Sequence, residues 1–249
     1  MRLVRHPVCV AIALLATVLL PSTVWAGPSG KKKDKAAVPT VRWAEGKPGC
    51  TFTRGDDGKY RYGLWTDDLG ITLAVDSQEL QKVRRRPEPM FGVSLILRYR
   101  GTSALEVRND NLTLEFVTHY HVVHSSLDPD NLSTRLQNGA AALSDEMERE
   151  IRKHPENKEE QEALLQSHEK DVAELQEFLS THSLRPVKLD PGNPEVSGWV
   201  FFGTRSKWIG DWKKREDFLL RIPFENRVLE FPFSLPPSEG DLILRKRPD

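Results

Sequence analysis

Several segments of the chain alternate apolar and polar positions, and this period of two predicts half-buried β-strands. The clearest segment is 91–100, where every odd position from Phe91 to Tyr99 carries an apolar or aromatic side chain. The segment 112–123 is the longest strand candidate. Aromatic and β-branched residues predict further strands at 60–65, 69–75, 198–202, 218–222 and 229–235. Prolines 232, 236 and 237 predict that the last of these strands lies at the edge or end of a sheet.

A different spacing separates the two groups of strands. From Leu132 onward, apolar residues recur at the three- and four-residue steps of amphipathic helices. Ser144 is expected to cap the first helix, and the sequence His154-Pro155-Glu156-Asn157 interrupts it. A second helix is predicted from Lys158 to Thr181. We therefore predict an αα-hairpin over residues 134–184.

Strands, one helical pair and strands again, without βαβ alternation, predict a mainly β protein with an α insertion. The expected fold is an antiparallel β-sandwich interrupted by the αα-hairpin. The strands after the hairpin are too few to bury a core alone. We therefore expect both groups in a single domain over residues 40–237, followed by a C-terminal tail at 238–249.

Some of these strands also resemble a known family. The segment Phe91–Thr102 resembles the strand and turn that open secreted bacterial immunoglobulin-like domains, and Val196–Phe202, Phe218–Pro223 and Leu229–Phe233 are similar to their closing strands. The resemblance covers about half of the chain that follows residue 26 and implies an immunoglobulin-like β-sandwich. The helical hairpin is a departure from that family, and no functional residue is carried over.

The N-terminal region has the pattern of an export signal. Two arginines precede an apolar run over residues 8–20, and small residues flank Trp25 in Val24-Trp25-Ala26. This pattern predicts a signal peptide over residues 1–26, and a periplasmic or secreted protein. Residues 27–39, rich in Gly, Pro and Lys, are predicted to form a disordered leader.

Charge and cysteine content narrow the function classes. The chain has 36 Lys and Arg against 36 Asp and Glu, which argues against nucleic-acid binding. After the signal peptide, no apolar run is long enough to predict a transmembrane helix. Since Cys9 lies in the predicted signal peptide, Cys50 has no partner for an intrachain disulfide. Burial, an intermolecular disulfide and a reactive thiol all remain open for Cys50.

The main metal-site candidate is the sequence His-Tyr-His-Val-Val-His at positions 119–124. On a continuous strand, His119 and His121 would project from the same face, and His124 could approach from the strand end. Such a set could bind Zn²⁺ or Cu²⁺, with Glu115 as a further ligand. The alternative is a solvated polar face of the sheet.

Two weaker candidates lie in predicted turns. Trp208 and Trp212, among basic residues, could contact a glycan or a protein partner, or could cover an open end of the sandwich. Asp128, Asp130 and Asn131 offer oxygen ligands at a turn, without the loop pattern of a known calcium motif.

The chain lacks the common catalytic sequences: there is no Gly-x-Ser-x-Gly, no His-Glu-x-x-His and no Gly-rich phosphate loop. We therefore expect no enzyme and no cofactor, but an exported binding or interaction protein. The hairpin would serve as a lid on the sandwich or as a docking surface for another envelope or secreted protein. The alternative function is periplasmic Zn or Cu binding through His119, His121 and His124.

Overall fold

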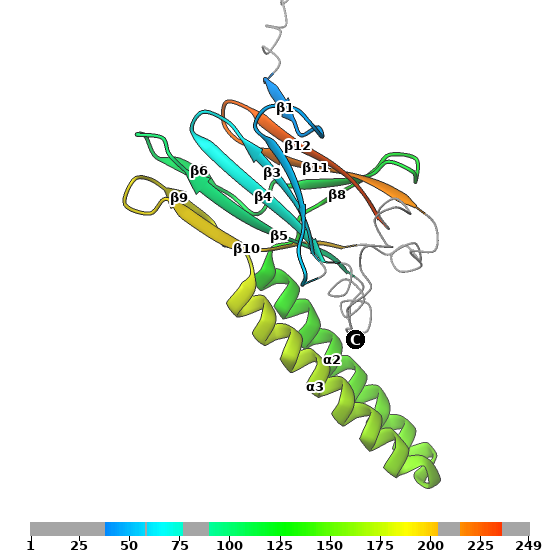
Figure 1. Ribbon diagram of the computed structural model, residues 1–249. Coiled ribbons are helices and arrows are strands. Elements are labelled where there is room, and N and C mark those ends of the chain that lie inside the picture. Colours follow the sequence, from blue (N-terminus) through cyan, green and yellow to red (C-terminus); the bar gives the residue numbers. More distant parts are fainter. Residues whose placement is uncertain (1–37, 58, 77–89, 204–214, 236–249) are drawn as a thin grey trace, which may run out of the picture. The chain divides into compact units, whose positions relative to one another are not determined.

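The computed structural model describes residues 38–57, 59–76, 90–203 and 215–235. The chain divides into two compact units, Met1–Ala37 and Val38–Asp249, and every described residue lies in the second. Among the described residues strand exceeds helix, 44% against 31%, so this part of the chain is mainly β with a helical hairpin (Figure 1). The predicted signal peptide, nearly all of the leader, the C-terminal tail, Trp208 and Trp212 lie outside the described residues.

The described elements follow one another in this order: β1 (Thr40–Arg42), β2 (Cys50–Arg54), β3 (Lys59–Trp65), β4 (Leu69–Asp76), β5 (Met90–Tyr99), β6 (Leu105–Val107), β7 (Thr113–Phe116), β8 (Val122–Ser125), α2 (Pro129–Lys153), the 3₁₀ turn η1 (Pro155–Asn157), α3 (Lys158–His182), β9 (Val187–Leu189), β10 (Glu195–Gly203), β11 (Glu216–Pro223) and β12 (Val228–Leu235). The six strands that the alternation predicted outside 112–123 are all present, with bounds shifted by a few residues.

The described strands form two five-stranded sheets and one two-stranded sheet. One large sheet has the order β1-β12-β11-β7-β8, the other has the order β10-β5-β4-β3-β2, and β6 pairs with β9. The pairing of β1 with β12 is parallel, and the other pairings between these strands are antiparallel. Strands from before and after the hairpin pair directly, β5 with β10 and β7 with β11.

One apolar core joins the two large sheets. The alternation in β5 buries Phe91, Val93 and the later odd positions in this core, whereas Arg98 is exposed. Aromatic rings cross from one sheet to the other: the ring centroid of Phe91 lies 5.2 Å from that of Phe218. Phe218 in turn stacks on Phe233 of the neighbouring strand at 5.1 Å. Such ring pairs contribute beyond the area that they bury.

The prediction of one long strand over 112–123 is wrong. This segment forms β7 and β8, which pair with each other through a tight turn. Tyr120 and His121 both have positive φ, and the Val122 N–H donates to the His119 carbonyl at 3.1 Å. Two successive left-handed residues at the centre of a turn closed by this bond are the type I′ geometry, here within the connection 117–121 between β7 and β8. Tyr120 falls on an even position, like the apolar residues Leu114 and Phe116, so the alternation continues through the turn and does not indicate it. The side chain of Tyr120 is 93% exposed.

The last strand, predicted at the edge or end of a sheet, is second in its sheet, and only its first residues are covered by the edge strand β1. β12 lies between β1 and β11, yet β1 pairs only with Val228–Glu230. The last backbone bond on that side runs from the Trp43 N–H to the Glu230 carbonyl, at 2.8 Å. Alternation along the strand directs the nitrogen of Pro232 to the same side, beyond the end of β1. The missing N–H of this proline therefore costs no ladder hydrogen bond.

Candidate interaction site at the helical hairpin

The first helix begins earlier than predicted. Asp128, and not Ser144, is the N-cap: its side chain accepts hydrogen bonds from the backbone N–H groups of Asp130, at 3.1 Å, and Asn131, at 2.8 Å. Pro129 occupies the first helical turn, where a missing N–H is harmless. The predicted turn is therefore the start of α2. The Asp128 carboxylate, considered above as a calcium ligand, caps the helix.

The two helices meet as predicted. α2 ends at Lys153, Pro155–Asn157 form a 3₁₀ turn, and α3 runs from Lys158 to His182, so both the break and the second helix are confirmed. Each helix has 25 residues. The helices lie side by side (Figure 1).

A small apolar cluster attaches the hairpin to the sheet that contains β5 and β10. It consists of seven buried side chains from the two helices and the two strands: Leu132, Leu136, Val172, Leu175, Leu179, Met90 and Phe201. The ring of Phe178 adds edge contacts to Trp199, at 5.8 Å, and to Phe201, at 6.2 Å. We call residues 128–136 and 172–185, which include these contacts, the hairpin root.

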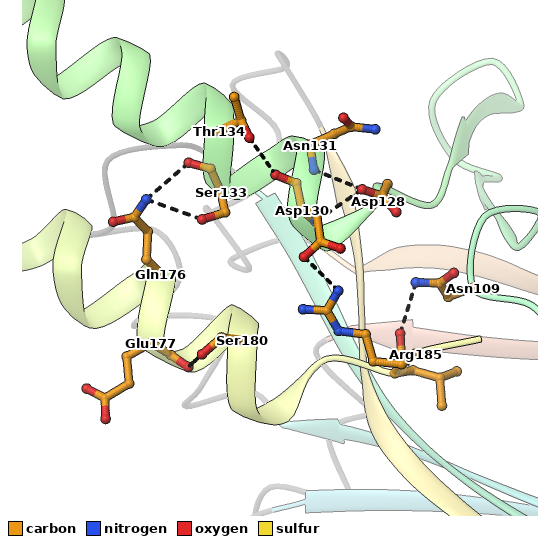
Figure 2. Close-up of polar contacts among 11 residues, drawn as sticks. Asn109, Asp128, Asp130, Asn131, Ser133, Thr134, Gln176, Glu177, Ser180 and Arg185 are labelled. Carbon is orange, nitrogen blue, oxygen red and sulfur yellow. Dashed lines mark hydrogen bonds and ion pairs between the residues drawn. The ribbon is translucent and has the colours of Figure 1, made fainter. Parts of the chain in front are cut away.

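Polar contacts tie the two ends of the hairpin together at this root. Figure 2 shows the Arg185 guanidinium donating to the Asp130 carboxylate at 2.7 Å. One turn further along, Gln176 Nε2 donates to the carbonyl and the hydroxyl oxygen of Ser133, both at 3.2 Å. Because residues that are distant along the chain share these bonds, the first turns of α2 and the last turns of α3 are held in register.

The chain that leaves α3 is bonded to the sheets. Buried Asn109 donates from its side chain to the Leu184 carbonyl at 3.0 Å (Figure 2), and the Leu184 N–H donates to the Trp199 carbonyl at 2.8 Å. The backbone passes so close to Gly198 that a Cβ there would lie 2.4 Å from the Leu184 nitrogen. Glycine is therefore required at this crossing.

Beyond the root, the burial of the hairpin stops. In the described helices, no residue of α2 after Leu136 and no residue of α3 before Val172 is buried. Leu164 is 56% exposed. Ion pairs within each helix, such as Lys158–Glu162 at 3.6 Å, lie on this part of the surface. The distal part of the hairpin therefore presents mainly exposed and half-buried side chains.

The histidines of the predicted metal site have separate partners. His119 Nε2 lies 2.8 Å from the Glu216 carboxylate of β11, and His121 Nδ1 lies 2.5 Å from the Glu115 carboxylate of β7. Both histidines belong to the turn between β7 and β8 and not to a strand. The premise that they share one strand face is therefore wrong.

His124, the third residue of the predicted set, lies on β8 with its ring 5.1 Å from the ring of Phe116. Burial lowers the pKa of His124 and so favours the neutral imidazole. Within the described ranges, no group of three or more His, Cys, Asp or Glu side chains is placed to hold a metal ion. Metal binding by these residues stays a prediction without a geometric basis.

A row of alternating charges, which sequence reasoning missed, crosses the sheet beside this turn. Arg221 lies between the carboxylates of Glu115, at 2.6 Å, and Glu230, at 3.0 Å, and Arg42 lies 3.3 Å from Glu230. The hydrogen bond from His121 is the main cause that holds the pKa of Glu115 below its usual 4.5; burial opposes it and Arg221 adds to it. These groups come from separate strands, so only the register brings them together.

Cys50 is half-buried on β2 and is a free thiol, and the Ala44 N–H points to its sulfur at 3.5 Å. This position leaves both the intermolecular disulfide and the reactive thiol open. Among the described helices, none is sufficiently long and apolar to span a bilayer.

Comparison with known proteins gives no relative: no family model, no curated protein and no solved structure matches the chain. The resemblance to secreted bacterial immunoglobulin-like domains therefore stays a prediction.

Proposed function

We propose that this chain is an exported, non-catalytic binding protein whose immunoglobulin-like β-sandwich presents the helical hairpin as a docking surface for another envelope or secreted protein. The main observation behind the proposal is the position along each helix at which buried side chains end. Buried positions in α2 stop at Leu136 and those in α3 start at Val172, so no side chain in the rest of the hairpin is buried within the described part of the chain.

This distribution of buried residues favours a docking surface over a lid, the other role that the sequence predicts for the hairpin. A lid would bury an apolar stripe of the helices against the sheets along most of their length. A 25-residue helix is about 37 Å long, and only the turns of the root are buried here. Exposed antiparallel helices offer a surface of regular spacing to a partner, as in other helix-mediated recognition.

The root supports the proposal because it restricts the direction of the hairpin. The Arg185–Asp130 ion pair and the Gln176–Ser133 hydrogen bonds join the two helices where they meet the sheets. A surface held in one orientation loses less conformational entropy on binding than a free one. The hairpin would therefore act as a preorganised arm.

The docking function is tested by shortening the arm. Deleting residues 141–147 and 164–170 removes one heptad from each helix and keeps the root and the connection between the helices. We expect thermal unfolding and near-UV circular dichroism of the sheets to be unchanged. Partners recovered from an envelope or culture-fluid extract by the full-length chain should be lost. Equal recovery of the same partners by both proteins would exclude docking through the distal hairpin.

Export is tested separately, on the full-length chain expressed in a bacterial host. Mass spectrometry of the protein released from the envelope should give a mature N-terminus at Gly27. An intact N-terminus in the cytoplasmic fraction would contradict the proposal of export.

A further inference from the structure

A cleft is lined by residues of both large sheets, and its described lining includes no residue of the hairpin root. Its volume is about 630 Å³, within the range of small-molecule sites. Aromatic rings form its apolar wall: the centroid of Tyr62 lies 5.0 Å from those of Trp43 and Phe52, and 6.1 Å from that of Phe233. The Trp43–Tyr62 pair is edge to face and the other two pairs are tilted. Rings in such contact restrain one another, so this wall is formed before any ligand arrives.

The charged groups of the cleft favour an anion. Its described lining contains three guanidinium groups and two carboxylates, those of Arg42, Arg54, Arg215, Glu45 and Asp217. Asp217 already accepts a hydrogen bond from Arg215 at 3.2 Å. Glu230 pairs with Arg42 at 3.3 Å but does not belong to this lining, so the lining itself has three guanidinium groups against two carboxylates.

Two side chains of the cleft, those of Arg54 and Tyr62, are suited to a ligand that is both flat and charged. The guanidinium of Arg54 lies over the Phe52 ring, 5.6 Å from its centroid, so a cation borders the aromatic wall directly. Burial raises the pKa of Tyr62 to about 12, so its phenol keeps its proton and remains a hydrogen-bond donor. A guanidinium and a phenol beside apolar rings are suited to a carboxylate attached to a ring.

We propose that this cleft binds a small organic anion, in which a carboxylate is joined to a flat apolar ring. The ring would lie against Trp43, Phe52 and Tyr62, and the carboxylate would face Arg54 and Arg215. This site does not depend on the docking function, because none of its lining residues belongs to α2 or α3.

Calorimetric titration of the full-length chain with 2-naphthoate and with 2-naphthalenemethanol tests the proposal, since the two probes share a ring system and differ in charge. We expect the carboxylate to bind at least about tenfold more tightly, because hydrogen bonds between charged groups contribute more than neutral ones. R54Q and R215Q should each weaken naphthoate binding by about tenfold and leave the alcohol unchanged.

R98Q is the matched control, because Arg98 pairs with Glu195 at 2.9 Å on β5 and β10 and does not line the cleft. It should bind naphthoate like the natural chain. Equal affinity for the two probes, or no binding of either at millimolar concentration, would overturn the proposal. So would naphthoate affinity that R54Q and R215Q leave intact while circular dichroism shows both variants folded.

Discussion

The core between the sheets and the distal hairpin are stabilised in opposite ways. In the core, Tyr60, Phe91 and Leu73 are completely buried, and their neighbours come from strands far apart along the chain. In the distal hairpin, by contrast, the apolar side chain of Leu164 is 56% exposed. Helical hydrogen bonds close within four residues, whereas strands depend on distant partners. The sheets should therefore tolerate substitution poorly and the distal hairpin well.

The largest difference is expected between a core residue and a distal apolar residue. Phe91→Ala removes a ring that contacts Phe116, Phe218 and Phe233, and should lower the free energy of unfolding by about 3–5 kcal/mol. Leu164→Ala, at an exposed helical position, should change it by less than about 0.5 kcal/mol. Urea unfolding followed by fluorescence measures both. Similar losses in the two variants would contradict the contrast.

Two glycines extend the comparison, because a Cβ should destabilise the protein at one of them and stabilise it at the other. A Cβ at Gly198 would approach the Leu184 backbone, so Gly198→Ala should destabilise the protein by about 1–3 kcal/mol. Gly139 lies within α2 with nothing near its Cβ position, so Gly139→Ala should stabilise α2 by about 0.5–1 kcal/mol. Thermal unfolding should move in opposite directions for the two variants. A shift of the same sign would show that the close approach at Gly198 is relieved elsewhere.

Loss of the N-cap of α2 should lower the free energy of unfolding less than loss of a core side chain, and it should mainly affect the hairpin. Asp128→Ala removes the acceptor for two backbone N–H groups and should cost about 1 kcal/mol. Ser144→Ala, in the middle of the same helix, is the control and should be neutral or slightly stabilising. Hydrogen exchange should show faster opening of the first turn of α2 only in the Asp128 variant. Equal exchange in both variants would argue against the cap.

The smallest expected effect depends on pH. Because the pKa of Glu115 is held below 4.5 in the fold, its stabilising contribution is complete above that value and is lost as the pH falls through the folded pKa. Glu115→Gln should therefore be less stable than the natural chain at pH 7, and the difference between the two stabilities should shrink as the pH falls below 4.5. Urea unfolding between pH 7 and pH 3 checks this. A constant difference over that range would contradict the lowered pKa.

Predictions from the spacing of residues were correct where the structure of an element depends only on residues within or next to that element. The alternation in β5 and the break at Pro155 are examples, since neighbouring residues alone produce both patterns. The turn at Tyr120 was missed because neither residue of its tip is glycine or asparagine, the usual residues at positive φ. Asp128 and Pro129 predict a turn as readily as a helix start, because both residues are common in both settings.

Other features could not be derived from spacing at all. β6 and β9 have three residues each and are strands only because they pair with each other across the hairpin. The arginines of the cleft lie at positions 42, 54 and 215, and no short motif connects them. The partners of His119 and His121 likewise come from β11 and β7.

The amino-acid sequence by itself determined the helical pair and the strands β3, β4, β5, β10, β11 and β12, because these depend on the period of apolar residues and on prolines within a few positions. Only the tertiary structure decided the sheet order, the tight turn at Tyr120, the limit of burial along the hairpin, and the meeting of Arg54 and Arg215 beside aromatic rings. Each of these depends on which distant segments pair and in what register, and that is settled by the burial of the whole core.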